Sequence, residues 1–280
     1  MCQWHIFSVG PANWVGGVAL SKSETLPGAF VGKREGCLYS IGNIEGIVMP
    51  DIRLHFTCRG EGHPLLLLHG NGESGDYFAR QIPYFSKSRK VYAVDTRGHG
   101  QSPRGTAPFT IDQFAEDLLC FMDRQGILRA DILGFSDGGN IALTFALRYP
   151  HRVSRLILNG ANLNPAGVKP SVQLPIILGY RAACRGRGEQ ARAKAELLGL
   201  MVKEPHIRPE DLAALRMPVL VIVGSRDMIR STHSQMIADR LPEGRMVVLK
   251  GDHFIASRRS AEFNQAVSAF LRDTEHVLYQ

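Results

Sequence analysis

The stretch that decides the fold is Asp131-Ile-Leu-Gly-Phe-Ser-Asp-Gly-Gly-Asn140. It begins in a short apolar run that predicts a buried strand, and residues 141–149 predict a helix that ends before Pro150. Between the two, residues 134–138 match the pattern G-x-S-x-G. In that pattern a serine occupies a tight strand-to-helix corner, and the flanking glycines let neighbouring backbone approach closely. A glycine-rich turn without chemistry gives the same five letters, but the position between a strand and a helix favours a nucleophile.

Length and composition indicate a globular protein with a large core. The chain has 280 residues, of which 44% are hydrophobic and 21% charged. No apolar run approaches the roughly 20 residues of a membrane helix, and the N-terminus lacks the pattern of a secretory signal. The formal net charge is +7, yet no basic cluster is interleaved with aromatic residues. The sequence therefore predicts neither a membrane nor nucleic acid as a partner.

Cysteine usage indicates a reducing compartment. The five cysteines are an odd number and form no C-x-x-C pair. This pattern favours reduced thiols and a cytoplasmic location, and it argues against a metal site. The cysteines are Cys2, Cys37, Cys58, Cys120 and Cys184.

Strand and helix patterns alternate along most of the chain. Pro64–Leu68 is a continuous apolar run, as expected for a central parallel strand that is buried on both faces. Further strands are predicted at 90–95, 155–160, 218–224 and 246–250, and helices after Thr110 and at about 230–241 and 259–272. The alternation predicts an α/β fold with a mostly parallel central sheet and helices on both faces.

Three regions are predicted from these patterns. Residues 1–44 form an N-terminal extension without sustained periodicity, residues 45–163 and 217–280 form the core, and residues 164–216 form an insertion. The core is expected to begin with a hairpin, made by residues 46–49 and 52–58, that turns at Pro50-Asp51.

The insertion, residues 164–216, is expected to be a small helical lid over the carboxyl edge of the sheet. Pro165, Pro170 and Pro175 are expected to break its first part, while residues 189–201 predict a helix. Nine Lys/Arg against five Asp/Glu leave the insertion with +4, more than half of the chain's +7. A basic lid would attract anionic substrates, but a solvated helical face explains the same charges and is the favoured interpretation.

A serine needs a base to remove its proton and a third group to orient that base. In an open parallel sheet such partners lie in loops after the carboxyl ends of later strands. Asp227 follows the strand at 218–224, and His253 follows the last strand. We therefore predict Ser136 as nucleophile, His253 as general base and Asp227 as the orienting acid.

From about Glu45 to Leu271 the chain resembles the α/β-hydrolase-fold superfamily, which includes serine esterases, lactonases, haloperoxidase-like enzymes and carbon–carbon bond hydrolases. The matching motifs, in order, are His69-Gly70 after a strand, Asp95-Thr-Arg-Gly-His-Gly-Gln-Ser102, the elbow at Ser136, and the loops of Asp227 and His253. The order serine, acid, histidine is that of the superfamily. The resemblance implies no metal and no organic cofactor.

The resemblance also implies an oxyanion hole made by the backbone N–H groups of Asn71 and Asp137. The carboxylate of Asp137 would oppose a developing oxyanion, so we expect it to point to solvent. Candidates for the substrate pocket are His69, Gly70, Phe135 and Phe254.

Three functions are compatible with the sequence. The first is hydrolysis of a small-molecule carboxylic ester, thioester or lactone through an acyl-enzyme. The second keeps the same triad but cleaves a carbon–carbon bond of a diketone acid, and the basic insertion is its only motivation. The third is a non-catalytic ligand receptor on the same fold, which a complete triad disfavours.

Overall fold

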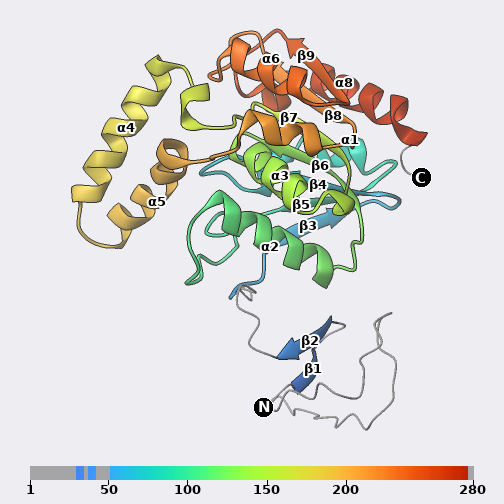
Figure 1. Cartoon of the computed structure of the whole chain (residues 1–280), viewed down its shortest axis with the longest axis horizontal. Coiled ribbons are helices and arrows are strands. Elements are labelled where there is room, and N and C mark those ends of the chain that lie inside the picture. Colours follow the sequence, from blue (N-terminus) through green and yellow to red (C-terminus); the bar gives the residue numbers. More distant parts are fainter. Residues whose placement is uncertain (1–29, 35–36, 42–50, 277–280) are drawn as a thin grey trace.

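The computed structural model describes residues 51–276 and two strands nearer the N-terminus, β1 (Phe30–Arg34) and β2 (Cys37–Ile41) (Figure 1). The strands β1 and β2 pair antiparallel and form a small sheet of their own, in a region where the sequence predicts no strand. The first arm of the predicted hairpin, residues 46–49, lies outside the described residues.

Seven further strands form the central sheet in the order β3-β5-β4-β6-β7-β8-β9. They are β3 (Phe56–Arg59), β4 (Pro64–Leu68), β5 (Lys90–Val94), β6 (Ala130–Phe135), β7 (Val153–Asn159), β8 (Val219–Gly224) and β9 (Gly244–Leu249). Only β3 runs antiparallel to its neighbour, β5, and every other pairing in this sheet is parallel. The predicted fold class is confirmed.

The predicted second arm of the hairpin is corrected in its start. The strand begins at Phe56, four residues later than expected, and it pairs with β5 at the edge of the sheet. Asp51, one of the two expected turn residues, accepts a hydrogen bond from the buried guanidinium of Arg97 at 2.7 Å. An ion pair with a distant loop therefore holds the chain just before this strand.

Helices cover both faces of the sheet (Figure 1). They are α1 (Ile82–Phe85), α2 (Ile111–Arg124), α3 (Asp137–Arg148), α4 (Pro170–Arg185), α5 (Glu189–Lys203), α6 (Ser231–Arg240), α7 (Ile255–Arg258) and α8 (Ser260–Asp273). Short 3-10 turns lie at η1 (Gly75–Phe78), η2 (Pro150–Arg152), η3 (Pro165–Gly167) and η4 (Pro209–Ala214).

Strand β4 shows how the sequence builds two cores. Its side chains alternate, so Leu66 and Leu68 join the cluster under α2, α3 and α6, while Leu65 and Leu67 join the cluster under α1 and α8. All four leucines are at most 1% exposed. At about 1.5–3 kcal/mol for each fully buried side chain, this one strand contributes strongly to the stability of the sheet.

Helix α2 begins where the sequence predicts. The Thr110 hydroxyl accepts a hydrogen bond from the backbone N–H of Gln113 at 3.2 Å and so caps the first turn. Phe114, Leu118 and Phe121 are buried against the sheet, as their spacing along the helix requires.

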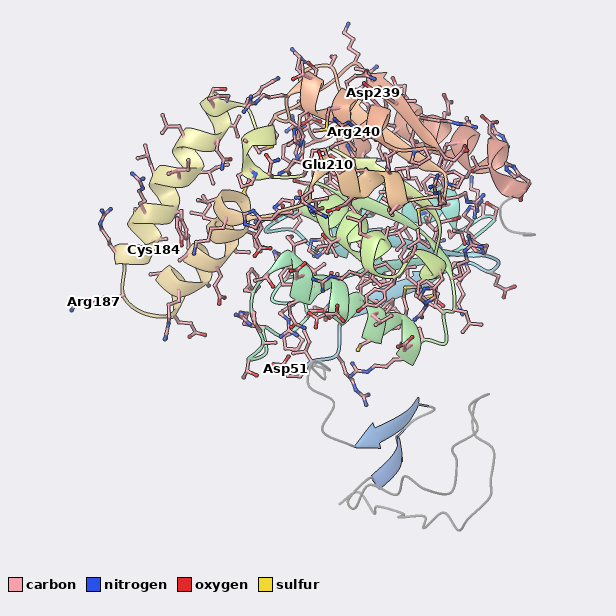
Figure 2. The ribbon with its side chains drawn as sticks, viewed as in Figure 1. Asp51, Cys184, Arg187, Glu210, Asp239 and Arg240 are labelled. Atoms are coloured by element: carbon pink, nitrogen blue, oxygen red, sulfur yellow. The ribbon has the colours of Figure 1, made fainter. Side chains whose placement is uncertain are left out.

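Helices α4 and α5 occupy the insertion between β7 and β8. They pack against one another, with α5 on the side of the sheet and α4 outermost, and Cys184 and Arg187 lie at the end farthest from the sheet (Figures 1 and 2). The expected break at the prolines is wrong for α4. Pro170 occupies the first turn, where its missing N–H has no intrahelical partner to lose, and Pro175 lies inside the helix. The boundaries of the insertion stay a prediction.

No helix in the part of the chain that the structure describes has the length and apolar character needed to cross a membrane.

Candidate active site

The candidate residues follow strands whose carboxyl ends lie along one edge of the sheet. Asn71 follows β4, Ser136 follows β6, Asp227 follows β8 and His253 follows β9. Because these strands run parallel, loops that are far apart in the sequence meet above their carboxyl ends.

Ser136 occupies a strained strand-to-helix corner. Its φ of 53° and ψ of −120° make it the one non-glycine residue with positive φ in the described part of the chain. Such a backbone costs on the order of 1–3 kcal/mol and persists only where the surroundings impose it. Here the Ser136 N–H donates to Asn159 O at 2.8 Å, and a Cβ on Gly138 would lie 2.1 Å from Leu68 O. The glycine is required because α3 starts directly against the end of β4.

Asp227 and His253 form a buried pair. His253 Nδ1 lies 2.7 Å from Asp227 Oδ1, and the same oxygen accepts the N–H of Ile229 at 2.9 Å. Burial raises the pKa of Asp227, but the hydrogen bond and charge of His253 and the backbone N–H groups of Ile229 and Gly224 together outweigh burial and hold that pKa below its usual range. The carboxylate is thus held charged against Nδ1, and His253 Nε2 has no hydrogen-bond partner in the described structure.

The imidazole of His253 lies beside the elbow. Its ring centroid is 4.9 Å from that of Phe135, the residue before Ser136. A Cβ on Gly160 would lie 2.6 Å from its Cε1, so this glycine leaves the space that the ring occupies. No hydrogen bond joins the hydroxyl of Ser136 to His253 within residues 51–276.

Two backbone N–H groups near Ser136 are available to a ligand. Neither the Asn71 N–H nor the Asp137 N–H donates to any acceptor in the described part of the chain. Asp137 starts α3, so its N–H also lies at the positive end of a helix dipole. This pair is the predicted oxyanion hole.

The expectation for the Asp137 carboxylate is wrong. It does not point to solvent: the residue is 8% exposed, Oδ2 accepts from Asn71 Nδ2 at 3.0 Å, and Oδ1 accepts from Asn140 Nδ2 at 3.1 Å. Burial raises its pKa to about 6, although both hydrogen bonds act in the opposite direction. The two amide donors make it possible to bury a carboxylate next to the elbow.

Comparison with known proteins shows to which superfamily the chain belongs. Residues 63–193 match the family described as "alpha/beta hydrolase fold". A 2-hydroxymuconate semialdehyde hydrolase from Pseudomonas sp. strain CF600 is 33% identical over 174 residues, 61% of this chain and 58% of that protein. A 3-oxoadipate enol-lactonase 2 from Acinetobacter baylyi is 25% identical over 256 residues, 79% of this chain and 94% of that protein. The chain belongs to the α/β-hydrolase superfamily.

Among solved structures, the enol-lactonase from Burkholderia xenovorans LB400 has a TM-score of 0.68 at 24% identity, over 79% of this chain and 97% of that one. That likeness concerns the fold alone. One of the two sequence relatives is named a hydrolase and the other an enol-lactonase, and the present chain is accordingly an α/β-hydrolase enzyme.

In this hydrolase, His69 ties two loops together. The Thr96 N–H donates to His69 Nε2 at 3.0 Å, so Nδ1 carries the proton and donates to Gly70 O at 2.8 Å. The side chain is 1% exposed, and burial lowers its pKa to about 4, so the ring is neutral at physiological pH. Its predicted place in the pocket stays a prediction.

The other pocket candidates lie around His253. A Cβ on Gly70 would meet the Phe135 ring at 3.0 Å, and Phe135 stacks on Tyr77 with centroids 4.2 Å apart. Phe254 is 37% exposed, and its ring centroid lies 5.7 Å from that of Phe135. Phe135 is only 1% exposed, so of these two phenylalanines Phe254 is the one that solvent reaches. The role of all three candidates in binding stays a prediction.

The motif from Asp95 to Ser102 has a structural role. Asp95 accepts the N–H groups of Gly75 and Gln101 at 2.7 and 2.9 Å, and the Ser102 hydroxyl donates to Asp95 O at 2.7 Å. The loop therefore closes on itself and holds η1 in place.

Two polar residues of the site carry no signal in the motif. Glu73 accepts the Gly70 N–H at 3.2 Å, and burial raises the pKa of its half-buried carboxyl while His253 acts to lower it. Asn140 lies one helical turn after Ser136 and donates to Asp137. A polar residue in an otherwise apolar helix is the signal by which Asn140 could have been found.

No group of three or more possible metal ligands occurs in the part of the chain that the structure describes.

Proposed function

We propose that this α/β hydrolase cleaves a small carboxylic ester, thioester or lactone through an acyl-enzyme on Ser136. The observation that carries the proposal is the strained serine at the elbow beside the buried Asp227–His253 pair. A buried carboxylate on Nδ1 leaves Nε2 as the nitrogen that exchanges protons with the serine.

The reaction follows from these positions. His253 Nε2 takes the Ser136 proton as Oγ attacks the carbonyl carbon, and the N–H groups of Asn71 and Asp137 stabilise the oxyanion. The imidazolium then gives its proton to the leaving oxygen or sulfur as the bond to the carbonyl carbon breaks. Water repeats the sequence on the acyl-enzyme and releases the acid, while Asp227 stabilises each imidazolium.

A second candidate is hydrolysis of a carbon–carbon bond in a diketone acid by the same residues. The similarity to a 2-hydroxymuconate semialdehyde hydrolase supports it. The charge of the insertion supports it less, because eight of its nine basic side chains are exposed. The ninth, Lys169, donates from Nζ to the backbone oxygen of Asp227 at 2.5 Å. A solvated helical face explains the positions of these charges. We propose that the substrate is a neutral or anionic small molecule and that the protein is cytoplasmic.

A fluorophosphonate tests the nucleophile directly. We expect a single adduct by intact mass on the wild type and on the control Ser231→Ala, which changes an exposed serine at the start of α6. Ser136→Ala should take up none and should lose on the order of 10⁴-fold or more in kcat/KM for its best ester.

A panel of aryl esters, thioesters, lactones and a vinylogous diketone acid then separates the substrate classes. Turnover of the diketone acid without turnover of esters would favour carbon–carbon hydrolysis. Full activity in folded Ser136→Ala would refute the proposal, and a folded wild type with neither adduct nor turnover would favour a ligand receptor.

A further inference from the structure

The side chain of Asn71 joins three parts of the molecule. Its Nδ2 donates to Asp137 Oδ2 at 3.0 Å and to Leu197 O, in helix α5, at 2.7 Å. Both hydrogens of the amide are therefore used, one on the first residue of α3 and one on the insertion. The backbone N–H of the same residue is one of the two proposed oxyanion donors.

The loop that carries Asn71 is held on one side only. Gly70 is fixed by His69 Nδ1, which donates to Gly70 O at 2.8 Å, and by Glu73, whose Oε2 accepts the Gly70 N–H at 3.2 Å and whose N–H donates to Gly70 O at 3.3 Å. On the other side, Gly72 has a φ of +75° with open space around it. Glycine backbone is permissive, so contacts of the Asn71 side chain help to define the direction of its N–H.

The hydrogen bonds continue from Asp137 to the start of the insertion. Asn140 Nδ2 donates to Asp137 Oδ1 and to Asn162 Oδ1, at 3.1 and 3.2 Å, and the Asn162 N–H returns a bond to Asn140 Oδ1 at 2.9 Å. Asn162 Nδ2 then donates to Asn164 O at 2.8 Å. Asn164 is the residue before η3, where the chain leaves the sheet for α4. One carboxylate and three amides thus connect helix α5 and the first residue of the insertion to the elbow.

Asp137 is the acceptor on which this chain of bonds depends. As a carboxylate it accepts from both Asn71 and Asn140, whereas the protonated acid offers one oxygen less to these donors. The charged groups that act on it are His253, which favours the carboxylate, and Glu204 after the end of α5, which opposes it.

We propose that Asn71 and Asp137 are positioning residues that couple the seating of helix α5 to the oxyanion hole. The inference rests on the acyl-enzyme function proposed above. When α5 is seated, Leu197 O and Asp137 together fix the Asn71 amide, and the Asn71 N–H is held towards Ser136. When α5 moves away, the glycine-flanked loop loses one of its two anchors and the hole loses a donor. Closure over the substrate therefore completes the site.

Asn71→Ala removes both anchors and keeps the backbone N–H. We expect kcat to fall by about 10- to 100-fold, the range for a misdirected donor. Affinity for a trifluoromethyl ketone analogue of the best ester, which forms an oxyanion on Ser136, should weaken by a similar factor. Affinity for the product acid should change less than twofold, because the product acid forms no oxyanion on Ser136 that the two N–H groups must stabilise.

Glu189→Gln is the matched control. Glu189 is the exposed first residue of α5. The substitution removes a charge from the same helix without touching Asn71 or the contacts that seat α5 on the core. We expect kcat and ketone affinity within threefold of the wild type.

Asp137→Asn keeps the shape of the side chain and provides a second test of the coupling if Asn71→Ala fails to fold. The acid limb of the kcat–pH profile should be steeper in the wild type than in the variant, because Asp137 must lose a proton in the wild type and the variant has no carboxyl group at this position. Glu204 is present in both proteins, so its titration cancels in the comparison.

The outcomes separate this inference from the proposed function. Full activity in Ser136→Ala would refute the acyl-enzyme mechanism itself. If Ser136→Ala is inactive while Asn71→Ala keeps wild-type ketone affinity, or loses no more of it than Glu189→Gln, the acyl-enzyme stands and the coupling is refuted. Identical acid limbs in the wild type and in Asp137→Asn also refute it.

Discussion

Replacing Asp137 with asparagine removes a carboxylate that the fold buries beside the proposed nucleophile. Burial raises its pKa from 3.8 to about 6. A shift of about two units corresponds to about 3 kcal/mol, at 1.36 kcal/mol for each unit. Because the folded-state pKa lies above the unfolded one, the folded state binds this proton more tightly. The resulting stabilisation is complete below pH 3.8 and is lost as the pH rises through 6.

Between pH 5 and pH 7.5 roughly half of this amount, about 1.5 kcal/mol, should be lost in the wild type and not in Asp137→Asn. Asparagine itself forfeits a hydrogen bond to Asn71 or Asn140, worth about 1 kcal/mol, but that loss is independent of pH. The unfolding free energy of the variant relative to the wild type should therefore shift in favour of the variant by about 1.5 kcal/mol.

Urea denaturation of both proteins at the two pH values measures the difference, with other titrating groups cancelling between them. Asp239→Asn, at an exposed carboxylate on α6 (Figure 2), is the control, because that group stays in water in the folded state. A difference between Asp137→Asn and the wild type that is the same at pH 5 and pH 7.5 would refute the reasoning. Greater stability together with lower activity is the expected pattern for a group retained for function.

Two further substitutions test how the site is held. Gly138→Ala places a Cβ 2.1 Å from Leu68 O, so we expect little folded protein or a loss of more than about 2 kcal/mol by denaturation; Gly199→Ala, at a helical glycine that likewise has no positive φ and whose new Cβ would lie 3.4 Å from the nearest atom, is the control. Arg97→Lys should cost about 3 kcal/mol, because the buried guanidinium bonds both oxygens of Asp117 at 2.7 Å and an ammonium cannot. A midpoint of denaturation equal to that of the wild type would contradict either expectation.

The sequence predicted the parts of the molecule that depend on local pattern. The apolar run at β4 could only be a strand buried on both faces, and Gly134 and Gly138 marked the corner at Ser136. Asp227 and His253 could be predicted because loops that follow parallel strands lie along one edge of the sheet. Each of these inferences needs only residues close in sequence and the direction of the strands.

What the sequence did not predict depends on partners far along the chain. Asp137 was expected in solvent, because a carboxylate beside the serine would oppose a developing oxyanion; one of the two donors that allow its burial, Asn71, lies 66 residues away. The start of the second hairpin arm was wrong for the same reason, since Asp51 pairs with Arg97, which lies 46 residues away. The expected break in α4 overstated the effect of Pro175, which interrupts one bond of a helix whose neighbour α5 packs along it.

The bond from Asn71 to Leu197 O sets a rule for building chimeras of this hydrolase. Exchanging residues 164–216 for the equivalent segment of a relative changes the walls around the substrate while the sheet stays intact. The recipient, however, still has the Asn71 amide, whose Nδ2 needs a main-chain oxygen as acceptor at the position of Leu197 O. A grafted segment that supplies such an oxygen keeps the Asn71 amide in place. A grafted segment without it must be transferred together with the loop after β4 of the same relative. Swapping the two segments together is therefore the safer unit of exchange.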